Sequence, residues 1–171
     1  MLRSLILCLL LLPAMANAQA EPPMTPERVA QIALALDPDA RPTPNGFEMT
    51  IDNVPVLVIV DAAANRMRAM VPIRLAEDMS AEELTRVMQA NFDSALDARY
   101  ALANGRLWGV FIHSLAELKR DQLISGLGQT VNIANTYGTL FTGGTFQFGA
   151  GDSNTLQRDL LDELLERGQD I

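Results

Sequence analysis

The dipeptide Asn104-Gly105 constrains the fold of this chain more than any other local feature. Asparagine followed by glycine readily adopts the two positive φ angles that a two-residue hairpin turn requires. Mainly apolar segments lie on both sides of the dipeptide, so we predict two antiparallel strands joined by this turn. The turn length sets the register: Leu102 lies opposite Leu107, and Tyr100 lies opposite Gly109, where its ring covers backbone that has no side chain.

A second hairpin is predicted at Asp52-Asn53. Alternating apolar and polar residues precede this dipeptide, and a nearly continuous apolar run follows it. A two-residue turn would place three opposed apolar pairs on one face of the sheet, and a slip of one residue would turn them all to solvent. The six side chains are Phe47, Met49, Ile51, Val54, Val56 and Val58.

Helix signals complete an α+β pattern. Thr25 can cap a helix whose first turn holds Pro26 and Glu27. Ser80 and Glu83 have the spacing of a capping box at the start of a second helix. The predicted elements are helix 26–36, strands 46–51, 54–60 and 66–71, helix 80–96, strands 99–103 and 106–112, a long helix from 114–119 to about 137, a short strand at 145–148, and an amphipathic helix at 155–167.

Two helices carry features that need an explanation. On the middle helix, the helical period directs four side chains toward the sheet: Leu84, Val87, Met88 and Ala95. Inside the long helix, Gly126 and Gly128 each cost roughly 1 kcal/mol relative to alanine. We infer either that another element packs closely against these glycines or that the helix is locally weak.

The order of elements resembles the type III secretion chaperone-like fold, which CesT-like proteins and YbjN-like domains share. The resemblance covers residues 25–141, and it rests on Asn65-Arg66-Met67-Arg68, the middle helix from Leu84 to Phe92, and the hairpin Asn104-Gly105-Arg106-Leu107-Trp108. It implies an α+β domain in which a three-stranded meander and a hairpin pack on helices, in the order α-β-β-β-α-β-β-α with an added C-terminal helix. It also implies a tendency to form homodimers and a role in holding other polypeptides.

The first twenty residues have the layout of a secretory signal peptide. Arg3 precedes an apolar run from Leu5 to Leu12, and the small residues of Ala18-Gln19-Ala20 form a cleavage site before Glu21. The run is too short to span a bilayer as a stable helix. We therefore expect a periplasmic or secreted protein, divided into a signal peptide (1–20), a chaperone-like domain (21–141), and a glycine-rich loop with a C-terminal helix (142–171).

Composition excludes several classes of partner. The formal net charge is −8 at pH 7, and an acidic chain repels phosphate backbones, so nucleic-acid binding is not expected. No second long apolar run follows the signal segment, which argues against stable membrane insertion after cleavage. The only cysteine, Cys8, would leave with the signal peptide, and the large Leu7 before it disfavours a lipid attachment site.

Residues that could carry catalysis or hold a metal are sparse. His113 is the only histidine, and without a cysteine or a G-x-S-x-G motif in the mature chain it has no nucleophile to activate. One histidine cannot supply a zinc site, and Asp152 with Asp159 lacks the spacing of a calcium loop. We therefore predict neither a metal site nor a cofactor.

The remaining candidate motifs are better explained by structure than by catalysis. Gly143-Gly144 and Gly149-Ala150-Gly151 lack the Lys-Ser/Thr ending of a phosphate-binding loop. Glu82-Glu83 and Asp162-Glu163 lie at a helix start and on a solvated helix face, where acids are common. The sequence thus predicts a protein that is not an enzyme.

The candidate partner-binding residues are Trp108, Val110 and Ile112. They share one face of the strand after the hairpin turn, whereas Leu107, Gly109 and Phe111 share the other. One face must meet the helices, and the other can be covered by the C-terminal segment, a second subunit or a client peptide. The leucines of the C-terminal helix can likewise dock on their own domain or on a partner. We predict an exported protein-binding domain, with a homo-oligomeric structural or envelope-assembly protein as the alternative.

Overall fold

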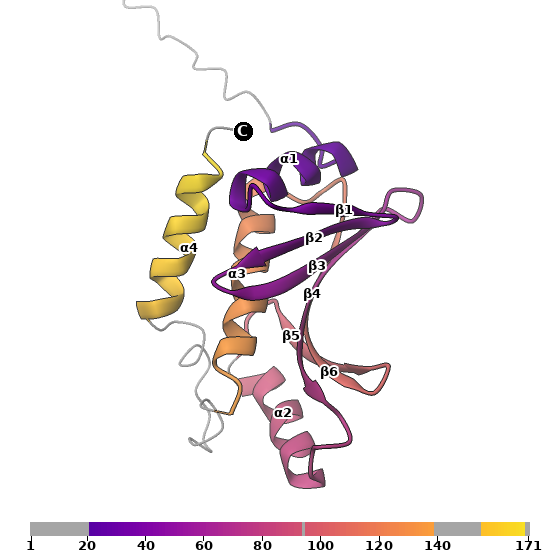
Figure 1. Cartoon of the computed structure of the whole chain (residues 1–171), viewed down its shortest axis with the longest axis vertical. Helices are drawn as coiled ribbons and strands as arrows, with labels where there is room; N and C mark the ends of the chain where they lie inside the picture. The colour runs from indigo at the N-terminus through magenta and orange to yellow at the C-terminus, as the bar shows by residue number, and fades with distance from the viewer. Residues whose placement is uncertain (1–20, 94, 139–154, 170–171) are drawn as a thin grey trace, which may run out of the picture.

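A computed structural model describes residues 21–93, 95–138 and 155–169, which form an α+β fold (Figure 1). The predicted signal peptide and the strand predicted at 145–148 lie outside these residues. The elements are α1 (Pro26–Leu36), β1 (Arg41–Thr43), β2 (Gly46–Ile51), β3 (Val54–Asp61), β4 (Arg66–Leu75), α2 (Ala81–Asp93), β5 (Arg99–Ala103), β6 (Arg106–Ser114), α3 (Arg120–Asn135) and α4 (Thr155–Arg167).

The strands form one antiparallel sheet in the order β1-β2-β3-β4-β6-β5. The predicted meander and hairpin are therefore neighbours, joined by the pairing of β4 with β6. In Figure 1, α3 runs along one side of the strands, and α4 lies beside α3 on the side away from the sheet. α1 packs near β2 and α2 near β5, so the helices cover the two ends and the middle of the same face.

Both predicted hairpin registers are confirmed. Ile51 pairs with Val54 next to the first turn, and Leu102 pairs with Leu107 one pair beyond the second turn. The turn residues have the positive φ angles that this geometry needs, 49° and 60° at Asp52 and Asn53, and 51° and 69° at Asn104 and Gly105. The expected apolar face at the first hairpin is buried at Met49, Ile51, Val56 and Val58, and partly buried at Phe47 and Val54.

The core lies between the covered face of the sheet and α3. The main cluster joins α1, the sheet and α3, and a second cluster joins α2, β5, β6 and the end of α3. Gly126 allows the close approach, because a Cβ there would lie 2.5 Å from the Phe111 ring. Of the two explanations for the helix glycines, close packing is the correct one at Gly126. A Cβ at Gly128 would meet Leu164 at an ordinary 3.5 Å.

Several details differ from the sequence-based prediction; for example, α2 ends at Asp93, so Ala95 is not on the helix. Strand β1 was not expected, because three residues that include a proline carry no alternating pattern. β4 runs on to Leu75 through a bulge between Pro72 and Arg74, which turns Ile73 toward the second cluster. Met88 was expected on the inner face of α2 but is 66 % exposed, because the contacts of α2 with the core pass through Val87 and Ala90.

The C-terminal helix docks on its own domain. α4 packs along α3, and Leu164 is buried within the main cluster. Arg167 Nη1 donates a 3.2 Å hydrogen bond to the Leu36 carbonyl at the end of α1. Among the described helices, none is both long enough and apolar enough to cross a membrane.

Candidate functional site

Strand β6 separates two environments, as its alternating pattern predicts. Leu107, Gly109 and Phe111 are buried against the helices. Trp108 and Val110 are half-buried, and Ile112 is 53 % exposed on the opposite face. Trp108 is held against the hairpin because its Nε1 donates a 3.0 Å hydrogen bond to the Ala103 carbonyl. The three predicted partner-binding residues therefore lie together on the face that the described helices leave uncovered.

The sheet register extends this apolar surface across three strands. In one row Val110 pairs with Met70, which pairs with Leu57; in the next row Arg68 separates Ile112 from Ile59. A third row pairs Trp108 with Pro72. We call these apolar residues the open-face patch: Leu57, Ile59, Met70, Pro72, Trp108, Val110 and Ile112. None of them belongs to either core cluster of the described chain.

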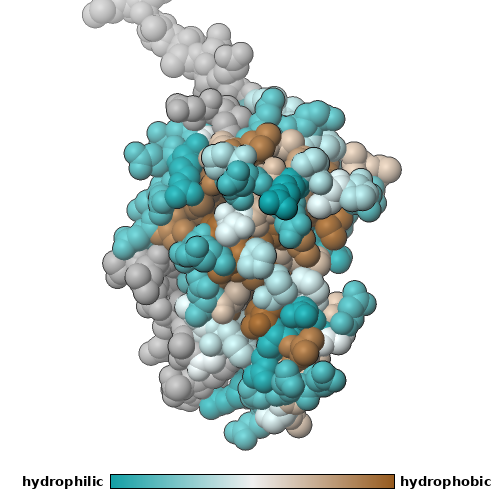
Figure 2. Space-filling model, viewed as in Figure 1, coloured by the Kyte–Doolittle hydropathy of each residue, from teal (hydrophilic) through white to brown (hydrophobic). Residues whose placement is uncertain are grey.

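The open-face patch has charged residues at its margin. Ile59 and Ile112 line a groove of about 500 Å³ that also contacts Arg66, Arg68 and Asp61. Both arginines are exposed, so they can pair with an acidic group beside an apolar contact. Figure 2 shows hydrophobic side chains reaching the surface in several separate areas between hydrophilic ones.

A second groove lies at the far end of β6, where the strand meets the first turns of α3. It has a volume of about 530 Å³. Its walls come from four separate parts of the chain: Asp97, Phe111, Ile112, His113, Asp121, Gln122, Ser125 and Leu165. We call this the edge groove. The sequence analysis did not predict the edge groove, because its residues are far apart in the chain and come together only through tertiary packing.

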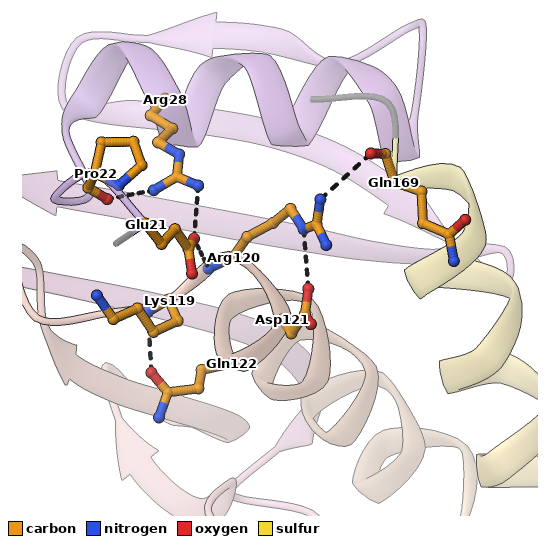
Figure 3. Close-up of polar contacts among 8 residues, drawn as sticks. All are labelled: Glu21, Pro22, Arg28, Lys119, Arg120, Asp121, Gln122 and Gln169. Atoms are coloured by element: carbon orange, nitrogen blue, oxygen red, sulfur yellow. Dashed lines mark hydrogen bonds and ion pairs between the residues drawn. The ribbon is translucent and has the colours of Figure 1, made fainter. Parts of the chain in front are cut away.

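A network of polar contacts fixes the helix end that forms one wall of the edge groove (Figure 3). Gln122 Oε1 accepts a 2.9 Å hydrogen bond from the Lys119 backbone N–H, and Asp121 pairs with Arg120 Nε at 2.9 Å. Glu21 accepts the Arg120 backbone N–H at 2.8 Å and pairs with Arg28 at 2.6 Å. The N-terminal segment, α1 and α3 are thus joined at one point.

The pKa of Glu21 is lowered from its ordinary value. The main cause is the hydrogen bond from the Arg120 backbone N–H, with a further contribution from Arg28, and burial opposes both. Donors that bind the charged form of a carboxyl favour ionisation. Glu21 is therefore an ionised cap for α3.

The candidate acid–base residues have structural partners. Glu83 accepts the Ser80 N–H and pairs with Arg74 at 3.1 Å, and these contacts lower its pKa, the Ser80 hydrogen bond most strongly. Ser80 completes the predicted capping box by accepting the Glu83 N–H. His113 stacks on Phe111 with ring centroids 6.0 Å apart, and its Nδ1 lies 2.7 Å from the Ser114 carbonyl oxygen. Within the described residues, no three His, Cys, Asp or Glu side chains gather as metal ligands.

The outer side of α2 is a third surface of interest. Met88 is 66 % exposed and Phe92, one helical turn later, is 64 % exposed. Leu96 after the helix and Leu102 on the neighbouring strand are also about half exposed, at 45 % and 53 %. Large apolar side chains on one helix face are typical of an interface.

Comparison with known proteins places the fold. No family model and no curated protein sequence matches the chain. The Yersinia pestis type III secretion chaperone SycH, solved in complex with a stable fragment of YscM2, aligns with a TM-score of 0.50 and 21 % identity. The alignment covers 66 % of this chain and 98 % of that one. The chain has a type III secretion chaperone-like fold.

Two further solved structures align with lower scores. The ExsC–ExsE complex gives a TM-score of 0.44 and 13 % identity over 57 % of this chain and 77 % of that chain. The HopA1–SchA chaperone–effector complex gives 0.43 and 14 % identity over 53 % of this chain and 73 % of that chain. The SycH alignment and the observed order of elements confirm, at the level of the fold, the resemblance implied by the sequence.

Proposed function

We propose that this protein is an exported, non-catalytic domain that binds another polypeptide through the open-face patch. The observation that carries the proposal is the in-register apolar surface on β3, β4 and β6, which includes Trp108, Val110 and Ile112 on β6. An exposed apolar patch of this kind is typical of a surface that binds a partner. The solved complex of SycH with a fragment of YscM2 supports a polypeptide as the partner.

The chemistry of the open-face patch suggests what the partner presents. Apolar side chains would displace water from Trp108 and Ile112, and each buried Å² of apolar surface contributes about 25 cal/mol. An acidic group at the margin would pair with Arg66 or Arg68. An amphipathic segment with an apolar centre and a flanking carboxylate fits both conditions.

Export is the part of the proposal that rests on sequence. Arg3, the apolar run and the Ala18-Gln19-Ala20 site have the layout of a signal peptide. Cleavage there would leave Glu21 as the first residue, and Glu21 is held at α3 by Arg120 and Arg28. The partner would accordingly be met in the periplasm or outside the cell.

The absence of catalysis in this proposal follows from the roles of the polar residues. Glu83 serves as a helix cap and ion-pair partner, and its lowered pKa makes it a poor proton donor near neutral pH. The one histidine stacks on Phe111 beside a backbone carbonyl. Neither residue has an activated nucleophile beside it among its described contacts.

Self-association is the second candidate, and the exposed side of α2 favours it. Met88, Phe92 and Leu102 together offer an apolar surface on one end of the molecule. A twofold interface pairs the same surface of two copies, so such a patch can cover itself. A homo-oligomeric structural or envelope-assembly protein would use this surface and leave the open-face patch to solvent or to a client.

The test is capture of partners by the immobilised mature chain from periplasmic extract. Wild type is compared with Trp108→Ala and with Leu34→Ala, a matched removal of an apolar side chain that is 49 % exposed on α1. We expect a partner that Trp108→Ala loses and Leu34→Ala retains. Equal capture by all three proteins, or recovery of only the chain itself, would contradict a client site on the open-face patch.

A further inference from the structure

Strand β6 extends beyond the end of β5, the edge strand that pairs with it. β5 pairs with β6 only from Ala103↔Arg106 to Arg99↔Val110. β6 continues to Ser114 and stays paired with β4 on its other side. Over residues 111–114, therefore, the described chain places no strand against β6 on the β5 side.

The backbone of this segment presents hydrogen-bonding groups to the gap. Next to a two-residue turn the pair Ala103↔Arg106 exchanges both backbone bonds, and every second pair after it does the same. By this alternation the N–H and C=O of Arg106, Trp108 and Val110 point toward β5. Those of Ile112 point the same way, beyond the end of β5.

A specific contact keeps the chain before β5 out of the gap. The backbone N–H groups of Asp97 and Ala98 both donate to Gln129 Oε1, at 2.9 and 3.1 Å. Gln129 is itself 5 % exposed on α3, so the contact is built into the core. The chain is thus drawn toward α3, and the edge groove opens between it and the end of β6.

The charge of the edge groove selects the occupant. Its described lining residues carry two carboxylates, Asp97 and Asp121, together with amide, hydroxyl and imidazole groups, and include no lysine or arginine. Asp121 also pairs with Arg120 Nε at 2.9 Å, so a basic side chain entering the groove would face Asp97 and would share Asp121 with Arg120. A strand of about four residues would match the open length of β6, at roughly 3.3 Å per residue.

We propose that the edge groove binds a short extended polypeptide segment that carries a basic side chain, by adding a strand to β6 beyond β5. Backbone bonds to Ile112 would set the register, and Asp97 and Asp121 would select the charge. This inference rests on the proposed function in taking a polypeptide as partner, but it uses the backbone edge of β6 and shares only Ile112 with the open-face patch.

The test uses a fluorescein-labelled peptide of alternating lysine and valine, with fluorescence anisotropy for binding and NMR hydrogen exchange for its position. In the free protein the Ile112 amide should exchange faster than those of Phe111 and His113, which face β4. The peptide should slow exchange at Ile112. Replacing lysine by glutamate in the peptide, or methylating its backbone nitrogens, should abolish both effects.

Protein variants locate the charge selection. Asp121→Lys should weaken binding of the lysine–valine peptide on the order of tenfold, whereas Glu77→Lys, the same change at an exposed site outside the groove, should not. Circular dichroism of both variants checks that α3 is intact. Unchanged exchange at Ile112 in the presence of bound peptide, or full binding of the methylated peptide, would overturn the inference.

The two proposals fail separately. Trp108→Ala should retain binding of the lysine–valine peptide, because the Trp108 side chain does not line the edge groove. Loss of peptide protection at Ile112 with partner capture still dependent on Trp108 would remove this inference and leave the proposed function. Peptide binding at Ile112 with no Trp108-dependent partner would remove the proposed function and leave this inference.

Discussion

Leu107 and Trp108 are neighbours in the chain and belong to opposite halves of the molecule. Leu107 is fully buried among α2, β5 and α3, whereas Trp108 lies half-buried in the open-face patch. Both faces of β6 are apolar, but only one has helices against it in the described chain. Hydrophobicity along a strand therefore does not distinguish residues that stabilise the core from residues that are available to a partner. The position of the helices makes that distinction.

The covered face is closed by shape as well as by hydrophobicity. A Cβ at Gly109 would approach Ile133 at 3.0 Å, and one at Gly126 would approach the Phe111 ring at 2.5 Å. Gly109 on β6 faces α3, and Gly126 on α3 faces β6, so the two elements can lie close together. On the open face, Arg68 divides Ile59 from Ile112, so that surface remains compatible with water.

The largest expected effect is on the covered face. Leu107→Ala would leave a cavity among fully buried neighbours, and such changes destabilise by about 2–5 kcal/mol. Urea denaturation followed by circular dichroism measures the free energy of unfolding. A loss below 1 kcal/mol would mean that α2 and β5 do not form a packed core with α3.

Gly126→Ala should be the next largest change, and it should destabilise. Alanine normally gains about 1 kcal/mol over glycine inside a helix. Here its methyl group would overlap the Phe111 ring, and overpacking of a core typically costs about 1–3 kcal/mol. We expect a net loss of about 1 kcal/mol in the free energy of unfolding, restored in part when Phe111→Leu is added.

Gly128→Ala is the matched change two residues along the same helix, and it should stabilise. Its methyl group would meet the Leu164 side chain at 3.5 Å, an ordinary contact. The helix-propensity gain of about 0.5–1 kcal/mol should then be retained. A destabilised Gly128→Ala protein would show that α4 packs on α3 more tightly than this distance indicates.

The effects of Gly126 and Gly128 show where sequence reasoning stops. The two hairpin registers, the capping box at Ser80 and the faces of β6 were predictable, because each depends on residues close in the chain. The sequence cannot rank two glycines in one helix, because only the position of Phe111 across the core distinguishes them.

The candidate sites divide in the same way. Trp108, Val110 and Ile112 could be grouped from strand alternation alone, whereas the edge groove combines Asp97, Asp121 and other residues that are distant in sequence. Met88 was assigned to the wrong face because helical spacing allows a wide stripe. The buried stripe of α2 is narrower than the spacing allows. At the end of the sheet, α2 contacts the core only through Val87 and Ala90.

A smaller effect should appear in acid. The pKa of Glu21 is lowered below its ordinary value of 4.5, so its contribution to stability is present above that value and is lost as the pH falls through the lowered pKa. Glu21→Gln should therefore be less stable than wild type near neutral pH, and the difference should shrink in acid. Unfolding by urea from about pH 7 to about pH 3 measures this, with Glu77→Gln as the control.

The smallest change in stability should come from the open face. Ile112→Thr keeps a β-branched side chain at a position that is 53 % exposed, so the free energy of unfolding should change by no more than about 0.5 kcal/mol. The matched Val56→Thr places the same hydroxyl at a fully buried position of the covered face, where an unpaired hydroxyl costs about 1–3 kcal/mol. Partner capture should follow the opposite order and fall with Ile112→Thr. If both variants lost similar stability, the open face would be part of a packed interface in the free protein, and its residues could not be reserved for a client.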